Sequence, residues 1–304
     1  MLERLDMPPD KSDSFFWSDF VELRALIHPD RCYSRGDLFS LEKRCRDFGI
    51  SFDAEIKWRE ILNFTAQRTL EFSDSYPYEI SSDKDTISLK SEEDTHQRTY
   101  LGLLVASCMR HVVDRRRGEV ARDFEETCFV VFSNLMPKGA EIRATWANGG
   151  AIAPYKGPLY KKMQQVAADL RCAPNFQERD FKTTDTGDGG IDLISWHPMA
   201  DNREGIPISF AQCGCSKEDW RFKQSEASFE RHGQKLPVMH PWATYYFMPL
   251  DFRWADGGWA YKSDLGKTII VDRLRLIRLA TEYGVHDQLP PMTFVDEIRN
   301  LSYC

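Results

Sequence analysis

The fold is decided by two segments with apolar strands, GDGGIDLISW at 187–196 and ISFAQCGCSK at 208–217, in which Asp192 and Gln212 are the polar residues of interest. In the first segment we expect a strand at 191–197, because apolar residues follow a glycine-rich turn. Side chains alternate between the two faces of a strand, so Asp192 shares a face with Ile194 and Trp196. A carboxylate among apolar side chains is costly without a partner. The pattern therefore predicts a functional carboxylate at Asp192.

Gln212 is the matching polar residue of the second segment, close to the end of a strand expected at 206–213. Adjacent strands can bring Asp192 and Gln212 to one edge of a sheet, where a carboxylate and an amide oxygen suit Mg²⁺. Water cuts a phosphodiester more readily beside such a hard cation. We expect these two residues to be a metal-facing catalytic pair. Asp188, in the preceding turn, either reaches the metal through water or stabilises the turn by bonding its own backbone.

The surrounding elements form a definite order: a helix at 159–171, strands at 176–184, 191–197 and 206–213, a helix at 219–232, and a strand at 243–248. This order, with an acid opening the second strand, resembles the PD-(D/E)XK nuclease superfamily. Within it, the chain is most similar to the Mrr-type branch, whose third strand carries Gln-X-Lys. The matching residues are GDGGID at 187–192 and FAQCGCSK at 210–217, and the resemblance covers 159–249 of the 304 residues.

The resemblance implies an α/β fold of the α+β mixed-sheet kind, a restriction-endonuclease-like core. It implies a phosphodiesterase that depends on Mg²⁺, for which Mn²⁺ can substitute, and that cuts DNA. The expected substrate is double-stranded DNA, and the expected role is in restriction or antiviral defence.

Gly214 departs from the pattern, because the resemblance implies a lysine two residues after Gln212. Such a lysine would hold the attacking water and offset negative charge. Three explanations are open: Lys217 reaches back, Lys223 on the following helix supplies the ammonium, or the site is catalytically weak. We take Lys217 as the third catalytic residue, because its backbone directly follows the strand.

The helix at 159–171 departs from the pattern as well. Many relatives carry a glutamate on this helix, whereas this chain has Gln164 and Gln165, either of which is a candidate substitute. Glu125 and Glu126, in the sequence Phe-Glu-Glu, are similar to the start of the Mrr-type helix. They lie far upstream and fit the core only if the segment that follows them is an insertion.

The rest of the chain is organised around this core. Residues 1–143 are expected to be mostly helical, 144–158 to be a linker rich in Gly and Pro, and 159–304 to be the nuclease-like domain with a C-terminal extension. By analogy, the helical region senses, forms a homo-oligomer or binds a partner protein. Its Arg115, Arg116 and Arg117 are candidate nucleic-acid contacts, although such a cluster also suits a helix dipole.

Composition sets outer limits on function. Hydrophobic residues make up 42%, enough for a sizeable core. No apolar run approaches the ~20 residues of a membrane span, and the first residues do not form a signal peptide, so we expect a cytoplasmic protein without a membrane partner. The eight cysteines fit neither a disulfide framework nor a zinc pattern. A net charge of −7 argues against a surface that binds polyanions all over. Besides the nuclease, a module that keeps the fold and binds DNA or a protein without cutting stays open, and so does the same chemistry on RNA.

Overall fold

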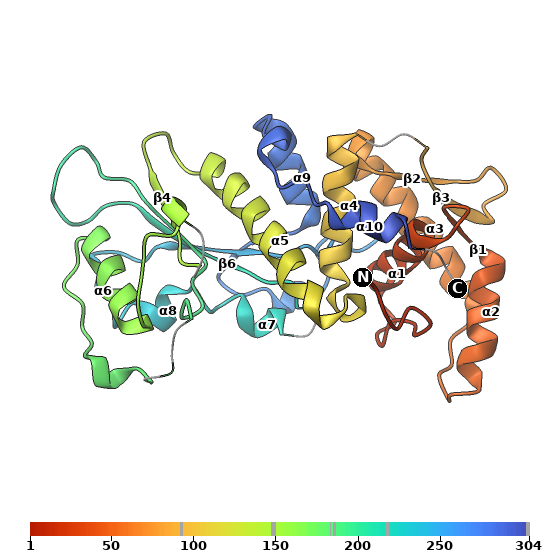
Figure 1. The fold of residues 1–304 in the computed structure, drawn as a ribbon, viewed down its shortest axis with the longest axis horizontal. Coiled ribbons are helices and arrows are strands. Elements are labelled where there is room, and N and C mark those ends of the chain that lie inside the picture. Colours follow the sequence, from red (N-terminus) through yellow and green to blue (C-terminus); the bar gives the residue numbers. More distant parts are fainter. Residues whose placement is uncertain (92–93, 147–149, 183, 185–186, 217–218, 302–304) are drawn as a thin grey trace. The chain divides into compact units, whose positions relative to one another are not determined.

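The computed structural model describes residues 1–91, 94–146, 150–182, 184, 187–216 and 219–301, and its elements are labelled in Figure 1. The chain divides into two compact units. The first takes in Met1–Thr127, Pro249–Lys262 and Asp272–Cys304, and the second takes in Cys128–Met248 and Ser263–Val271. The expected linker at 144–158 therefore lies inside the second unit, and the residues from Asp272 onward belong to the first.

The first unit combines helices with a small antiparallel sheet of order β1-β3-β2. Its elements are α1 (Ser14–Ile27), β1 (Cys32–Ser34), α2 (Arg35–Arg46), α3 (Ala54–Phe72), β2 (Tyr78–Ile80), β3 (Thr86–Leu89), α4 (Thr95–Ser107), α9 (Arg273–Glu282) and α10 (Phe294–Arg299). Polar caps fix several helix starts: Ser34 and Asp37 form a capping box on α2, and the Asp53 side chain accepts from the Ile56 amide on α3. Helix α5 (Asp114–Leu135) begins in this unit and ends in the second.

The second unit is built on a five-stranded mixed sheet of order β4-β5-β6-β7-β8. Its elements after α5 are β4 (Glu141–Ala144), α6 (Leu159–Asp169), β5 (Leu193–Trp196), β6 (Ile208–Cys213), α7 (Trp220–Lys223), α8 (Phe229–His232), β7 (Ala243–Phe247) and β8 (Ile269–Val271). β4, β5 and β6 pair antiparallel, whereas β7 and β8 follow β6 in parallel. The expected mixed α and β architecture is thus confirmed.

The core of the second unit lies on the face of the sheet covered by α6. Ile194 pairs with Phe210 and Trp196 pairs with Ile208 across β5 and β6. All four side chains are buried in one cluster with Met163, Val166 and Ala167 of α6 and with Leu170, which caps that helix. The opposite face carries Phe132 of α5, whose ring packs edge-on against Tyr245 and Phe247 of β7. The alternation expected around Asp192 therefore holds in the structure.

The expected strand at 176–184 is wrong over its described residues. Gln177 and Asp180 form a capping box that turns the chain into a short 3-10 helix, Glu178–Asp180. The rings of Phe176 and Phe181 pack together, 5.2 Å between centroids, instead of alternating across a sheet. The first strand of the sheet is β4, and the expected helix at 219–232 is divided into α7 and α8.

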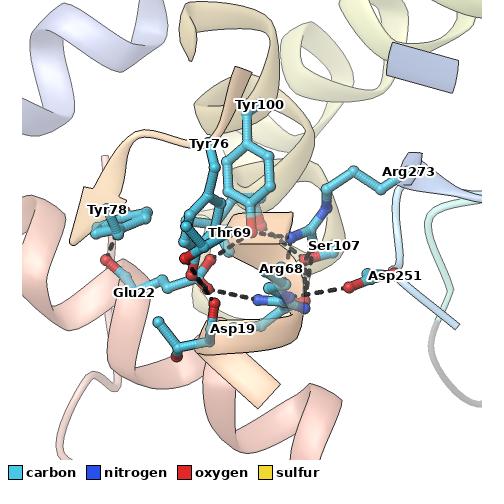
Figure 2. A network of polar contacts seen from close by, with 12 residues as sticks. Asp19, Glu22, Arg68, Thr69, Tyr76, Tyr78, Tyr100, Ser107, Asp251 and Arg273 are labelled. Atoms are coloured by element: carbon cyan, nitrogen blue, oxygen red, sulfur yellow. Dashed lines mark hydrogen bonds and ion pairs between the residues drawn. The ribbon is translucent and has the colours of Figure 1, made fainter. Parts of the chain in front are cut away.

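A buried network of charges holds the first unit together (Figure 2). The Arg68 guanidinium donates to Asp19 and Glu22 of α1, both at 2.7 Å, and to Asp251 at 2.9 Å. Arg273 of α9 donates to the other oxygen of Asp19 at 2.8 Å. Hydroxyl groups add further hydrogen bonds, because Tyr76 and Tyr100 donate to Glu22 and Ser107 donates to Asp19. The second oxygen of Asp251 is buried without a hydrogen-bond partner among the described residues. Residues 249–262 and 272 onward are thereby fastened to the N-terminal helices.

Among the described residues, no helix is both long and apolar enough to cross a membrane.

Candidate functional site

Asp192 lies immediately before β5 and is almost fully buried, 3% exposed. Its amide donates to the Ala211 carbonyl at 2.9 Å, and its Oδ2 accepts a hydrogen bond of 2.6 Å from the Cys213 amide. The carboxylate therefore reaches across to the end of β6, directly beside the peptide that follows Gln212. The backbone of Asp192 is also held from the β4 side, because the Thr145 amide donates to the Asp192 carbonyl at 3.0 Å.

Gln212 carries a buried acceptor that no described group satisfies. The side chain is 7% exposed, and its Nε2 donates a long hydrogen bond, 3.5 Å, to the Cys213 carbonyl. Its Oε1 is buried and has no hydrogen-bond partner among the residues that the structure describes. β5 and β6 run antiparallel, and Leu193 pairs with Ala211. Asp192 comes one residue before Leu193 and Gln212 comes one residue after Ala211, so the two residues face each other at the end of the ladder. The predicted pair is therefore brought together at one end of the β5–β6 ladder.

Tyr246 of β7 completes this corner, and no sequence pattern pointed to it. It pairs in parallel register with Gln212, so both side chains lie on one face. Its hydroxyl is buried and, within the described chain, has no hydrogen-bond partner. A Cβ added at Gly214 would lie 2.3 Å from that hydroxyl. Gly214 is thus required by the tyrosine that fills the space, and this explains why no lysine stands there.

Two thiols and two carboxyl groups influence the Tyr246 hydroxyl. Burial holds its pKa well above the usual value, and Cys215, Cys213, Glu226 and Asp192 raise it further. The tyrosine is therefore a neutral phenol at neutral pH, with a proton to donate.

Glu226 is a second carboxylate that the sequence did not single out. Its side chain packs over Gly190, where an added Cβ would lie 2.8 Å from the Glu226 Cβ and 3.4 Å from Oε2. Gly190 also has a φ of +86°, which favours glycine for a second reason. The Glu226 carboxylate lies 3.6 Å from Arg231. The glycine turn thus admits an acid from the segment between α7 and α8.

Asp188 stabilises the turn, as one of its two interpretations predicted. Its Oδ1 accepts from the Gly190 amide at 2.7 Å. Beside it, the buried Lys162 of α6 donates to the Gly187 carbonyl at 3.1 Å. Burial lowers the pKa of Lys162, whereas the nearby Asp188 carboxylate raises it. This corner therefore holds an ammonium group that sequence reasoning did not identify, because a lysine on an amphipathic helix looks like a solvated residue.

The other predicted lysines and amides have different settings. Lys217 lies outside the described residues. Lys223 is half-buried at the end of α7. Gln164 is exposed, and Gln165 hydrogen-bonds the backbone of Lys156 and Lys161. The two glutamines therefore point away from the apolar face of α6.

Glu125, Glu126 and the arginine cluster are parts of α5 that belong to the first unit. Both glutamates are half-buried. Arg116 pairs with Glu119 and Glu297, and Arg117 pairs with Asp114. Arg115 is exposed. Two of the three candidate phosphate contacts thus already carry ion pairs.

The donor atoms at the corner are of the kind that Mg²⁺ prefers. Asp192 supplies a carboxylate and Gln212 an amide oxygen, both buried and both hard ligands. Within the described ranges, no group of three or more His, Cys, Asp or Glu side chains is placed to hold a metal. A cation here would take its protein ligands from Asp192 and Gln212 and complete its shell with water and substrate oxygens, as Mg²⁺ commonly does.

Comparisons of the chain with protein-family models, with curated proteins and with solved structures give no match.

Proposed function

We propose that this protein is a metal-dependent endonuclease that hydrolyses phosphodiester bonds of double-stranded DNA, with Asp192 and Gln212 as the residues that hold Mg²⁺ or Mn²⁺. A bound cation of this kind polarises phosphoryl oxygens and lowers the pKa of a water molecule. Restriction or antiviral defence is the role that the resemblance suggests.

The observation that carries the proposal is the buried Oε1 of Gln212, which lacks a partner in the described chain. Buried polar atoms in folded proteins are nearly always satisfied, so an orphan acceptor calls for a ligand. It lies at the same end of the ladder as a buried carboxylate that has one oxygen on the Cys213 amide. Two hard oxygen donors in one dry corner suit a small divalent cation.

The order of elements also supports the resemblance, with one change of assignment. α5, β4, β5, β6, α7 with α8, and β7 give a helix, three strands, a helical segment and a strand. β4 then takes the place expected for 176–184, and α6 lies in an insertion between the first two strands. In this assignment Glu125 and Glu126 lie on α5, the first helix of the order. This corresponds to the alternative in which the segment after these two glutamates contains an insertion.

The test is cleavage of supercoiled plasmid DNA with Mg²⁺ or Mn²⁺ by the wild-type protein and by Asp192→Asn. Asparagine can still accept the Cys213 amide but removes the negative charge, so the fold should stay and cleavage should be lost. Asp188→Asn, which keeps the turn bond to Gly190, is the matched control and should cut at a rate close to wild type. Cleavage that persists in Asp192→Asn would remove Asp192 from the reaction.

A second function, binding of DNA or a protein without cleavage, is favoured by one observation. The Tyr246 hydroxyl fills the space beside Gly214, so no ammonium can start from that position. Calorimetric titration with Mn²⁺ separates the two functions. Binding that disappears in Asp192→Asn supports the nuclease, whereas a wild-type protein that binds DNA but no Mn²⁺ supports the binding module.

A further inference from the structure

A second buried polar atom without a hydrogen-bond partner among the described residues comes from β7, whose Tyr246 pairs with Gln212. Tyr246 Oη and Gln212 Oε1 come from paired residues of adjacent strands, are both buried, and both lack a hydrogen-bond partner in the described part of the chain. They are not bonded to each other. One orphan atom can be an accident of packing, but two on neighbouring strands and on one face indicate that a ligand supplies their partners.

The position of the hydroxyl is fixed by its surroundings. The Tyr246 side chain is fully buried, and its ring runs over Gly214, with ring atoms 3.0 and 3.1 Å from where a Cβ at that glycine would be. The Gly214 amide donates to the Phe247 carbonyl at 2.9 Å, so the strand beneath the ring is tied to β7. The phenol is therefore held in one position over Gly214.

The chemistry of the hydroxyl differs from that of its neighbours. Asp192 and Gln212 offer acceptor oxygens, whereas a neutral phenol can donate a proton into a hydrogen bond. A phosphodiester brings anionic oxygens, and hydrolysis brings a water oxygen, all of which accept. The corner therefore joins two cation-binding oxygens with one donor for an oxygen of the reacting group.

We propose that Tyr246 is a catalytic residue of this site, whose hydroxyl donates a hydrogen bond to an oxygen of the bound phosphodiester or of the attacking water. This inference rests on the proposed nuclease function and assigns the donor that Gly214 cannot supply. The hydroxyl stays protonated throughout, and no bond to it forms or breaks. It stabilises charge that grows on oxygen as the phosphodiester is cut.

The test is Tyr246→Phe, which removes one oxygen and keeps the ring over Gly214. With wild-type protein that cleaves DNA, kcat should fall about 100-fold, the loss typical of one removed donor at a developing charge. KM should stay within about twofold, because the ground-state contacts persist. The affinity for Mn²⁺ alone, measured by electron paramagnetic resonance, should not change.

The matched control is Tyr155→Phe, in the same unit. The Tyr155 hydroxyl is already satisfied, since it donates to Asp169 at 2.7 Å. Tyr155→Phe should therefore lower the thermal midpoint and leave kcat intact, whereas Tyr246→Phe should lower kcat and leave the midpoint unchanged.

The outcomes separate the two proposals. If wild type cleaves and Tyr246→Phe cleaves equally well, the Tyr246 assignment is overturned and the nuclease proposal stands. A drop in midpoint for Tyr246→Phe as large as that for Tyr155→Phe would mean that the protein satisfies the hydroxyl internally, which also overturns it. Wild-type protein that cleaves nothing with either cation overturns both.

Discussion

Replacing Arg68 with methionine should destabilise the first unit severely. Arg68 is 1% exposed and makes charge-assisted hydrogen bonds to three carboxylates, those of Asp19, Glu22 and Asp251. Methionine keeps much of the aliphatic stem but removes the charge. The carboxylates of Asp19, Glu22 and Asp251 then stay buried without that cation, and only Asp19 keeps hydrogen bonds from Arg273 among the described contacts.

The magnitude follows from the cost of unpaired buried charge. Removing one partner of a buried ion pair typically costs about 3–5 kcal/mol, because the other charge stays desolvated. A domain of ordinary stability has about 5–15 kcal/mol in total. We therefore expect Arg68→Met to lose about 4 kcal/mol, which leaves the first unit close to unfolding at 37 °C.

The loss should depend on pH in a definite direction. Burial raises the pKa of Asp251 even in the wild type, where Arg68 opposes the rise. Without Arg68, the carboxyl pKa in the folded state rises further above its value in the unfolded chain. A raised folded pKa gives stability that is present at low pH and is lost as pH rises through it. The destabilisation should therefore be smaller near pH 5 than near pH 8.

Urea unfolding followed by tyrosine and tryptophan fluorescence at both pH values measures this. The matched control is Arg35→Met, which breaks exposed pairs with Glu55 and Asp85 and should destabilise the protein far less, because solvent screens exposed charges. A loss below 1 kcal/mol for Arg68→Met, or a loss that grows toward pH 5, would refute the account of the network.

Two further predictions concern the second unit. Gly214→Ala should destabilise the protein by about 1–3 kcal/mol through overpacking, because the new Cβ would lie 2.3 Å from the Tyr246 hydroxyl. The control is Gly118→Ala on α5, where no atom lies within 4 Å of an added Cβ, and this change should be neutral or stabilising. Equal shifts of the two variants in thermal melts would contradict the close contact at Gly214. His232 is buried, and burial lowers its pKa from 6.5 to about 4. As pH falls, the unfolded chain therefore binds the proton before the folded one does, and the free energy of unfolding should fall by up to about 3 kcal/mol between pH 6.5 and 4. The urea midpoint of His232→Gln should fall less than that of the wild type over this pH range. An equal fall in the two proteins would contradict the assignment to His232.

Local patterns predicted much of the fold, and long-range pairing decided the rest. The alternation of Asp192, Ile194 and Trp196 placed a carboxylate on the core face, and the structure has it there. β4 was missed, because EIRA is short, polar and adjacent to a Gly-rich stretch that looked like a linker. The strand expected at 176–184 failed because Gln177 and Asp180 cap a turn, a local preference that outweighs the aromatic spacing.

The site was predicted in part for the same reason. Asp192 and Gln212 stand out as polar residues in apolar strands, which is a local signal. Tyr246 gives no such signal, because an aromatic residue in a strand is ordinary core. The role proposed for it depends on the parallel register that pairs it with Gln212, and on the glycine beneath its ring. The one available signal was Gly214 itself, which indicated a neighbour that fills the space.

The buried network has a consequence for the nascent chain on the ribosome. Arg68 is separated from Asp251 by 183 residues, and Asp19 from Arg273 by 254. At about 5–20 residues per second, Arg68 is translated on the order of ten to forty seconds before Asp251. The helices of the first unit must therefore wait, incompletely paired, while the whole β4–β7 sheet segment is synthesised. A prematurely terminated chain would leave Arg68 and Asp19 without their late partners, and so expose itself to chaperones and proteases before a finished molecule is released.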